Sequence, residues 1–442
     1  MPTVNDNLWL FHVTRKNKYY HMKRPDGFLR LHLIPILISV AITSLCFIVF
    51  PLSSVLFAKK TVTVIPEHTT QIPGYYPNFR SAGMTEQKFQ KALSDGSTII
   101  FLGSSELTST HLDAIPYNFF NQYCQYPVLC IGHAGNQSLN MLSFLASNRG
   151  YFNKTKLVIM VSPSWFVSKA ARGTSLESFL EFNSDSFLTA LDRDPGVPVT
   201  AREYIYQYIA REIDNINSPS AIQKSIAYKY SAERNWISGI VIAPFVLYYD
   251  LLINIDSSIR RMFINKEVPD TKTPGADTLH AWHCRTILTE IPWDSIYFNN
   301  QKISLMRAAN NNFGIDSNYY NQFVRNDQYI LLTVPFRFNR EYRDFCTLLD
   351  FLSTTDCKPL IIIQPLNPFV YENLVEFKPL MDKVANTIDE HHFPCLNLFV
   401  SDTAQYARGD LEDVMHLGNP GWYKVDHFVF DNFLSGVSKE PL

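Results

Sequence analysis

The chain has 442 residues, of which 46% are hydrophobic and 18% charged, and its formal net charge is −2. This apolar share excludes an intrinsically disordered chain, and the balanced charge excludes a protein that binds nucleic acid through a basic surface. A mean hydropathy of −0.07 excludes a polytopic membrane protein. The seven cysteines contain no C-x-x-C pair, so their spacing favours neither a zinc site nor a disulfide framework. A pairing of Cys124 with Cys130 stays open.

Residues 33–57 form a long apolar stretch without a charged residue. At about 1.5 Å per residue, a helix of this length crosses a bilayer core of roughly 30 Å. Six Lys and Arg residues lie between positions 15 and 30, and only two more follow before Arg80. We therefore expect residues 1–32 in the cytoplasm, a single transmembrane anchor at 33–57, and the rest outside the cell membrane. A cleaved signal peptide fits less well, because the apolar run is long, begins late and lacks an A-x-A ending.

Beyond the anchor, residues 58–95 are rich in proline and glycine and then become helical in MTEQKFQKAL, so they predict a linker and a first helix. Residues 96–442 predict an extracytoplasmic α/β domain. In it, short apolar runs alternate with helical patterns, which is typical of a doubly wound parallel sheet with helices on both faces. Buried strands are expected at 97–103, 127–132, 156–162, 359–365 and 395–400.

Between about residues 168 and 340 this alternation stops. The segment is rich in Tyr, Phe and Asn and in helical patterns, so we expect a large, mostly helical insertion that caps the sheet. Its stretch 237–255 is apolar, but Pro244 and Asp250 interrupt it, which argues against a second membrane span. A buried helix is the favoured interpretation, and an amphipathic helix on the membrane surface is the alternative.

Candidate reactive residues lie near the two ends of this domain. The strand at 97–102 runs into a glycine and two serines, the second of which is Ser105. Ligands of open parallel sheets bind at the carboxyl ends of strands, although Gly-Ser is also ordinary turn sequence. Asp413 and His416 are three residues apart, which puts them on one face of a helical turn. The carboxylate can then orient the imidazole, whose other nitrogen takes the serine proton, so the combination predicts a Ser–His–Asp site.

Six segments carry a family resemblance: FLGSSEL (101–107), GHAGNQSL (132–139), SPSWF (162–166), NNNFGIDSNYY (310–320), EYRDF (341–345) and DVMHLGNPGW (413–422). On these segments the chain resembles the SGNH (GDSL-like) hydrolase superfamily, and most of all its DltD branch, the D-alanyl-lipoteichoic acid biosynthesis proteins. They run in the family's order over most of the chain beyond the predicted anchor. By this resemblance Ser105 takes the place of the GDSL serine, and Ser104 stands where the aspartate would be.

The resemblance also implies an oxyanion hole. Its expected donors are the backbone N–H groups of Ser105 and of Gly135, in the glycine-rich turn after the second strand. Most SGNH enzymes add an asparagine side chain after the third strand, but residues 162–165 contain none. Asn136 is the substitute that we expect. This departure argues against a rapid general esterase and favours a dedicated acyl-transfer enzyme.

The function that the resemblance implies is D-alanylation of teichoic acid outside a Gram-positive cell. Ser105 would accept the D-alanyl group and pass it to a hydroxyl of the acceptor, the lipoteichoic acid polymer, without a metal or cofactor. The donor is expected to be a carrier protein or a membrane intermediate. A membrane-bound O-acyltransferase is the expected partner, and no nucleic acid is expected. An esterase or thioesterase of the same fold, or a non-catalytic scaffold of the D-alanylation complex, are the alternatives.

Other polar residues have ordinary interpretations. The pairs at 391–392 and 426–427 contain His and Asp, but they lack a third ligand at a recognised spacing and so predict no metal site. Asp410 and Glu412, which flank Asp413, are expected to form a solvated acidic patch rather than to replace it.

Overall fold

The computed structural model describes residues 74–435 except 82, 83, 85, 125, 153, 235, 265–290 and 328. The chain divides into two units, Met1–Ile65 and Pro66–Leu442, and everything described below belongs to the second. The predicted cytoplasmic segment and the anchor at 33–57 lie outside the described residues.

A parallel six-stranded sheet forms the centre of the second unit, in the order β1-β3-β2-β4-β5-β6. Its strands are β1 Gly74–Tyr76, β2 Ile99–Leu102, β3 Val128–Ile131, β4 Lys156–Val161, β5 Leu360–Ile363 and β6 Cys395–Asn397. Five of them are the strands expected from the apolar runs, so the prediction of an α/β domain with a parallel sheet is confirmed. The edge strand β1 was not predicted, and it lies in the segment that was expected to be a linker.

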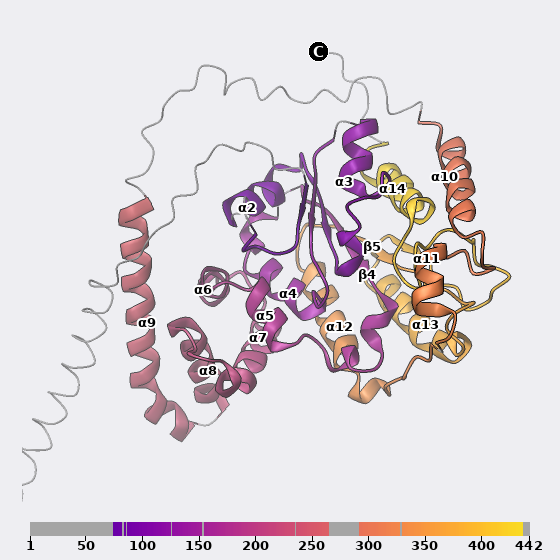
Figure 1. The fold of residues 1–442 in the computed structure, drawn as a ribbon. Helices are drawn as coiled ribbons and strands as arrows, with labels where there is room; N and C mark the ends of the chain where they lie inside the picture. Colours follow the sequence, from indigo (N-terminus) through magenta and orange to yellow (C-terminus); the bar gives the residue numbers. More distant parts are fainter. Residues whose placement is uncertain are drawn as a thin grey trace, which may run out of the picture. The chain divides into compact units, whose positions relative to one another are not determined.

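The helices fill the connections between these strands (Figure 1). Their bounds are α2 Glu86–Asp95, α3 Pro116–Phe119, α4 Ser138–Ala146, α5 Leu176–Phe182, α6 Asp185–Arg193, α7 Val199–Glu212, α8 Ala221–Arg234, α9 Trp236–Ile264, α10 Trp293–Arg307, α11 Ser317–Tyr319, α12 Arg340–Ser353, α13 Leu374–Glu390 and α14 Asn419–Phe433. The helix expected in MTEQKFQKAL is α2, and the described residues between 168 and 340 contain helices α5 to α11.

Both faces of the sheet are buried because successive side chains of each strand point to opposite sides. In β2, Ile100 and Leu102 join one hydrophobic cluster, together with residues of α4, α12 and α13. Ile99 and Phe101 join a second cluster with residues of α3 and α14. The expected placement of helices on both faces is thereby confirmed.

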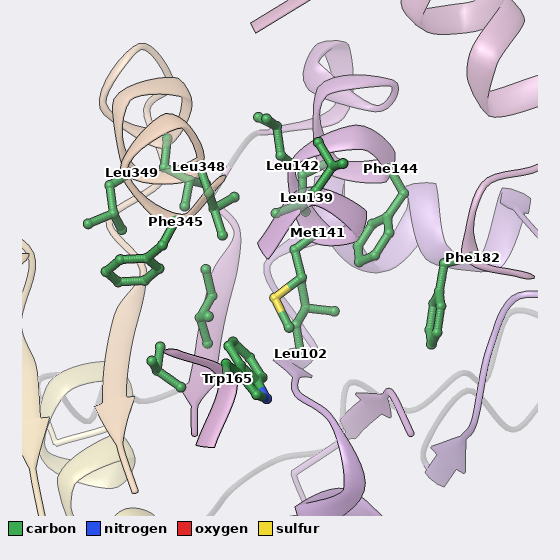
Figure 2. Packing of buried hydrophobic residues seen from close by; sticks show 14 of the residues in the cluster. Leu102, Leu139, Met141, Leu142, Phe144, Trp165, Phe182, Phe345, Leu348 and Leu349 are labelled. Carbon is green, nitrogen blue, oxygen red and sulfur yellow. The ribbon is translucent and has the colours of Figure 1, made fainter. Parts of the chain in front are cut away.

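Helix α4 connects the sheet with the helical insertion. All nine of its residues are buried, because α12 packs beside it and α5, α6 and α7 pack against it. Figure 2 shows Leu102 of the sheet and Trp165 facing side chains of α4, among them Met141, with Phe345 of α12 beside them. Helices α5, α6 and α7 of the insertion thus form a further layer on α4, while α10 packs against α14 on the other face.

Helix α9 differs from expectation. The buried helix predicted at 237–255 is wrong, because only 6% of the window Gly239–Asp256 is buried. Pro244 lies inside a continuous helix and does not end it. The window has a mean hydropathy of 1.5 and is long and apolar enough to cross a membrane by length and composition.

Asp426 of α14 is an unusual residue of the core. It is fully buried, and neither carboxylate oxygen has a hydrogen-bond partner among the described residues. Burial raises its pKa well above 3.8. The folded protein therefore keeps this carboxyl protonated at pH values where the unfolded chain ionises it.

We predict that Asp426→Asn makes stability less dependent on pH. A folded-state pKa above the unfolded value costs stability as pH rises, by about 1.4 kcal/mol for each pH unit between the two pKa values. Relative to the Asn variant, the parent protein should therefore lose stability as pH rises above the ordinary Asp range. Urea unfolding of both proteins over a pH series measures this. Asp431→Asn, at an exposed position of the same helix, is the matched control. A difference between parent and Asp426→Asn that stays constant with pH would contradict the assignment.

Candidate active site

The candidate site lies where the order of the sheet reverses. The connection from β2 leads to β3 on one side of β2, and the connection from β3 leads to β4 on the other side. In open parallel sheets, such a reversal leaves a crevice at the carboxyl ends of the strands, where ligands bind. Gly103 and Ser104 directly follow β2, and Ser105 begins a short 3₁₀ turn, Ser105–Thr108.

Ser105, His416 and Asp413 are joined by hydrogen bonds at the carboxyl end of β2. The Nε2 atom of His416 lies 2.8 Å from Ser105 Oγ, and its Nδ1 atom lies 2.6 Å from Asp413 Oδ2. An ionised carboxylate only accepts hydrogen bonds, so Nδ1 of a neutral imidazole carries the proton and Nε2 accepts from the serine hydroxyl. The three predicted residues are therefore together in space, in the order that a nucleophile, a base and an orienting group require.

The local backbone around Asp413 differs from the helical turn that we expected. Residues 411–417 form a bend closed by an antiparallel bridge between Leu411 and Leu417. Asp413 Oδ1 accepts hydrogen bonds from the backbone N–H groups of Met415, at 2.8 Å, and His416, at 2.7 Å. One carboxylate oxygen thus holds the turn and the other holds the imidazole, which fixes the ring without a helix.

The environment of His416 favours its protonated form. Burial alone lowers its pKa, but the hydrogen bond and charge of Asp413 more than offset that, and the net result is a pKa above 6.5. Glu106 and Glu412 also raise it through their charges. An imidazole of this kind takes a proton readily and is stabilised as the imidazolium.

The turn after β3 approaches the end of β2 very closely. A Cβ atom on Gly132, whose φ is +149°, would lie 1.9 Å from the carbonyl oxygen of Gly103. Asn136 is fully buried, and its Nδ2 donates to the same carbonyl at 2.8 Å. Gly135, with φ +92°, is exposed at the tip of the turn, and its carbonyl accepts from Ser178 Oγ at 2.6 Å. The turn therefore leaves Gly135 at the surface, while the Asn136 side chain ties the turn after β3 to the end of β2.

After β4, where most SGNH enzymes carry an asparagine, the chain has two serine hydroxyls. Ser162 Oγ and Ser164 Oγ lie 2.8 Å apart, and Pro163 begins a 3₁₀ turn between them. Since β4 neighbours β2 in the sheet, these hydroxyls lie at the same sheet edge as Ser105.

Glu106 is a residue of the site that sequence reasoning missed. Its side chain is buried, and its Oε1 accepts from the backbone N–H of Ser104 at 2.6 Å. Burial raises its pKa above 4.5, while hydrogen bonds from Ser104 N–H and the Gln364 side chain act in the opposite direction. A Cβ on Gly103 would lie 2.3 Å from Oε1, so the carboxyl requires glycine there. An acidic residue in the short turn that follows a buried strand was the available signal.

The two acidic neighbours of Asp413 do not form the solvated patch that we expected. Asp410 is buried, forms an ion pair with Lys424, and accepts from Tyr297 Oη at 3.2 Å. Glu412 is paired with His111, whose Nε2 lies 2.7 Å from Glu412 Oε1. Both residues have partners of their own, so neither replaces Asp413 in contact with His416.

Among the described residues, no group of three His, Cys, Asp or Glu side chains is placed to hold a metal ion. His391 lies 2.7 Å from the Thr387 carbonyl oxygen and 2.9 Å from Asp350. His427 stacks on Trp293, with ring centroids 4.5 Å apart. His391 therefore serves the C-terminal end of α13, and His427 packs against an aromatic ring.

We predict that Asp413→Asn lowers the pKa of His416, because it removes the main interaction that raises this pKa. An NMR titration of the imidazole in the parent and variant proteins measures the change. Glu412→Gln is the matched control, since its charge also raises the pKa of His416 but it does not contact the ring. Equal shifts in the two variants would contradict the dominant role of Asp413.

We predict that Glu106→Ala destabilises the protein by about 1–3 kcal/mol, because it leaves the buried N–H of Ser104 without an acceptor. Glu106→Gln keeps an oxygen at the Oε1 position and should cost much less. Urea unfolding measures both, and equal losses would contradict this role of the carboxyl oxygen.

Comparison with known proteins identifies the family of the chain. A model of the DltD protein family matches residues 79–435, which is well over half of the chain. Protein DltD of Lacticaseibacillus rhamnosus is 23% identical over 341 residues, covering 74% of this chain and 76% of that protein. The matched region runs from the turn after β1 to the end of α14 and contains Ser105, Asp413 and His416. The chain therefore belongs to the DltD family.

Proposed function

We propose that this protein transfers D-alanyl groups to teichoic acid through a covalent ester on Ser105. Membership of the DltD family indicates involvement in the D-alanylation of teichoic acids. The observation that carries the chemistry is the contact of His416 with Ser105 at 2.8 Å and with Asp413 at 2.6 Å. A serine hydroxyl, an imidazole and an orienting carboxylate in this arrangement support acyl transfer.

In the first half-reaction, His416 Nε2 takes the proton of Ser105 as Oγ attacks the carbonyl carbon of the D-alanyl donor. The bond from this carbon to the donor's oxygen or sulfur breaks, and His416 returns the proton to that leaving atom. In the second half-reaction, His416 takes the proton of an acceptor hydroxyl, and the alkoxide attacks the ester. Ser105 leaves with the proton, and the D-alanyl group is now on the polymer.

The backbone N–H groups of Ser105 and Gly135 are the proposed oxyanion donors. Among the described residues, neither group donates to another protein atom. Such donors contribute about 3 kcal/mol each to the transition state. Asn136 is the proposed side-chain donor, and it would use the amide N–H that does not contact the Gly103 carbonyl.

The proposed substrates and location follow from the family. The acceptor is a hydroxyl of lipoteichoic acid, and the donor is a D-alanyl carrier protein or a membrane intermediate. The D-alanyl ester adds an ammonium group to an anionic polymer and so weakens its attraction for cations. A membrane-bound O-acyltransferase is the proposed partner. The uncharged segment 33–57 is the proposed anchor that keeps the domain on the outer face of the cell membrane.

We predict that Ser105→Ala and His416→Ala abolish alkali-labile D-alanine on teichoic acid in cells that lack the native protein, whereas Ser104→Ala preserves it. The Ser104 hydroxyl donates to the His133 carbonyl and not to His416, so its loss should leave the reaction intact. The measurement is the D-alanine ester released by mild alkali from cells complemented with each variant at equal expression.

Normal ester levels in all three variants would contradict the proposed mechanism and favour a scaffold. The acceptor is tested separately with the purified full chain, labelled D-alanyl donor and teichoic acid. Label that appears only as free D-alanine would favour an esterase or thioesterase.

A further inference from the structure

Helix α9 presents apolar side chains to the outside of the domain. Ile240 and Leu247 are 68% and 70% exposed. Val241, Phe245 and Leu251 are exposed beside them. Figure 1 shows α9 at the edge of the fold, with α8 and α6 on one side of it. A single exposed leucine is ordinary, but five large apolar side chains on three turns of one helix form a continuous surface. We call these five residues the outer face of α9.

The polar groups of the same helix point toward the protein. Asp250 accepts from Ser225 Oγ at 2.7 Å and lies 3.1 Å from Lys229 Nζ. Asn254 accepts from Arg193 at 2.6 Å. Ile253 of the same helix is 7% exposed and packs in the hydrophobic core. Helix α9 therefore has apolar side chains on its inner side as well as on its outer face, whereas an ordinary surface helix presents a polar face to water.

Helix α8, which packs on α9, restricts how α9 can contact a membrane. Tyr228 of α8 packs on Phe245 and Tyr249 of α9, with ring centroids 5.7 and 5.8 Å apart. Helix α8 also carries Lys224, and Lys229 is paired with Asp192 of α6. If α9 crossed the bilayer, it would carry these charged side chains into hydrocarbon, at several kcal/mol each. The hydropathy of α9 therefore indicates contact with a bilayer but not passage through it.

Two features favour lipid over a protein as the occupant of the outer face. No charged residue lies on this face, since Asp250 is the one charged residue between Gly239 and Ile255 and it points inward. The outer face therefore offers no charged group with which a protein partner could form the polar contacts usual in protein interfaces. In addition, the proposed anchor at 33–57 holds the same chain beside a membrane. The sequence of α9 near its C-terminal end includes Arg260 and Arg261, a composition that suits an anionic lipid surface.

We propose that α9 lies parallel to the membrane plane, with its outer face inserted among the headgroups of an anionic bilayer. The proposal concerns a second membrane contact, beyond the anchor and separate from the chemistry of Ser105. It holds whether Ser105 transfers D-alanine, hydrolyses an ester or does neither.

Fluorescence quenching by brominated lipids tests the proposal on the full-length protein. The chain is reconstituted into vesicles of phosphatidylcholine and phosphatidylglycerol, with an environment-sensitive dye on Ile240→Cys or on Leu247→Cys. Val375→Cys, 71% exposed on α13, is the matched control, and the labelled parent protein corrects for native cysteines. All three substitutions are at exposed side chains, and circular dichroism verifies that each variant folds.

We expect about half of the fluorescence at positions 240 and 247 to be lost to bromines near the headgroups, and little at 375. The two α9 positions are seven residues apart on one face, so a helix parallel to the membrane gives them equal depth. A spanning helix would separate their depths by about 10 Å, and that result would overturn the proposal. Equal quenching at 247 and 375 would also overturn it. Dye spectra that shift with protein concentration in lipid-free detergent would overturn it too, in favour of a second copy of the chain.

Discussion

The hydrogen bond between Ser105 Oγ and His416 Nε2 joins residues 311 positions apart in the sequence. Its 2.8 Å length leaves a tolerance of a few tenths of an ångström, because hydrogen bonds weaken quickly outside a narrow range of distance and angle. The sheet meets this condition. Ser105 follows β2, which lies between β3 and β4 in the middle of the sheet. Helix α14 packs on one face of the sheet and so positions the turn with Asp413 and His416, which directly precedes this helix. The insertion contributes on both sides of the domain: α5, α6 and α7 pack on α4, while α10 packs on α14 and Asp316 N–H donates to the Glu412 carbonyl, next to Asp413.

A second constraint acts directly beneath the serine. The end of β2 is approached from one side by Gly132 and Asn136 and from the other by the Glu106 carboxyl. Both approaches leave no room for a side chain at Gly103 or Gly132. The resulting turn is held by hydrogen bonds on both sides, so the position of the Ser105 hydroxyl is fixed before any substrate arrives. The same closeness brings the Glu106 charge near enough to His416 to raise its pKa.

The sequence predicted the features that depend on local pattern. Five apolar runs gave five strands, and the two ends of the chain that carry Ser105 and Asp413 were expected to meet because parallel strands end at one edge. It did not predict β1, since three residues, GYY, make too short a run to stand out. It also misjudged Asp410, whose partner Lys424 is separated from it in sequence and is adjacent only once α14 is in place. An ion pair between residues of different elements depends on how those elements pack, and the sequence around either residue carries no pattern that predicts it.

Helix α9 shows why hydropathy alone misplaces a segment. Its composition suits a core, a membrane span or an interface equally, and the burial of its side chains and their polar contacts distinguish these cases. Because Asp250 meets Ser225 and Lys229 and Ile253 packs in the core, the outer face is turned away from the domain, and most of its apolar area stays uncovered after folding. Burial of apolar surface contributes about 25 cal/mol per Å², and here this free energy is available only to an external contact. With the anchor proposed at 33–57, a chain with such a face would have two attachment points to the membrane, and these would restrict its rotation. The Ser105 crevice would then face lipid-linked substrates in a fixed orientation, and encounters would cost less entropy than with a freely rotating domain.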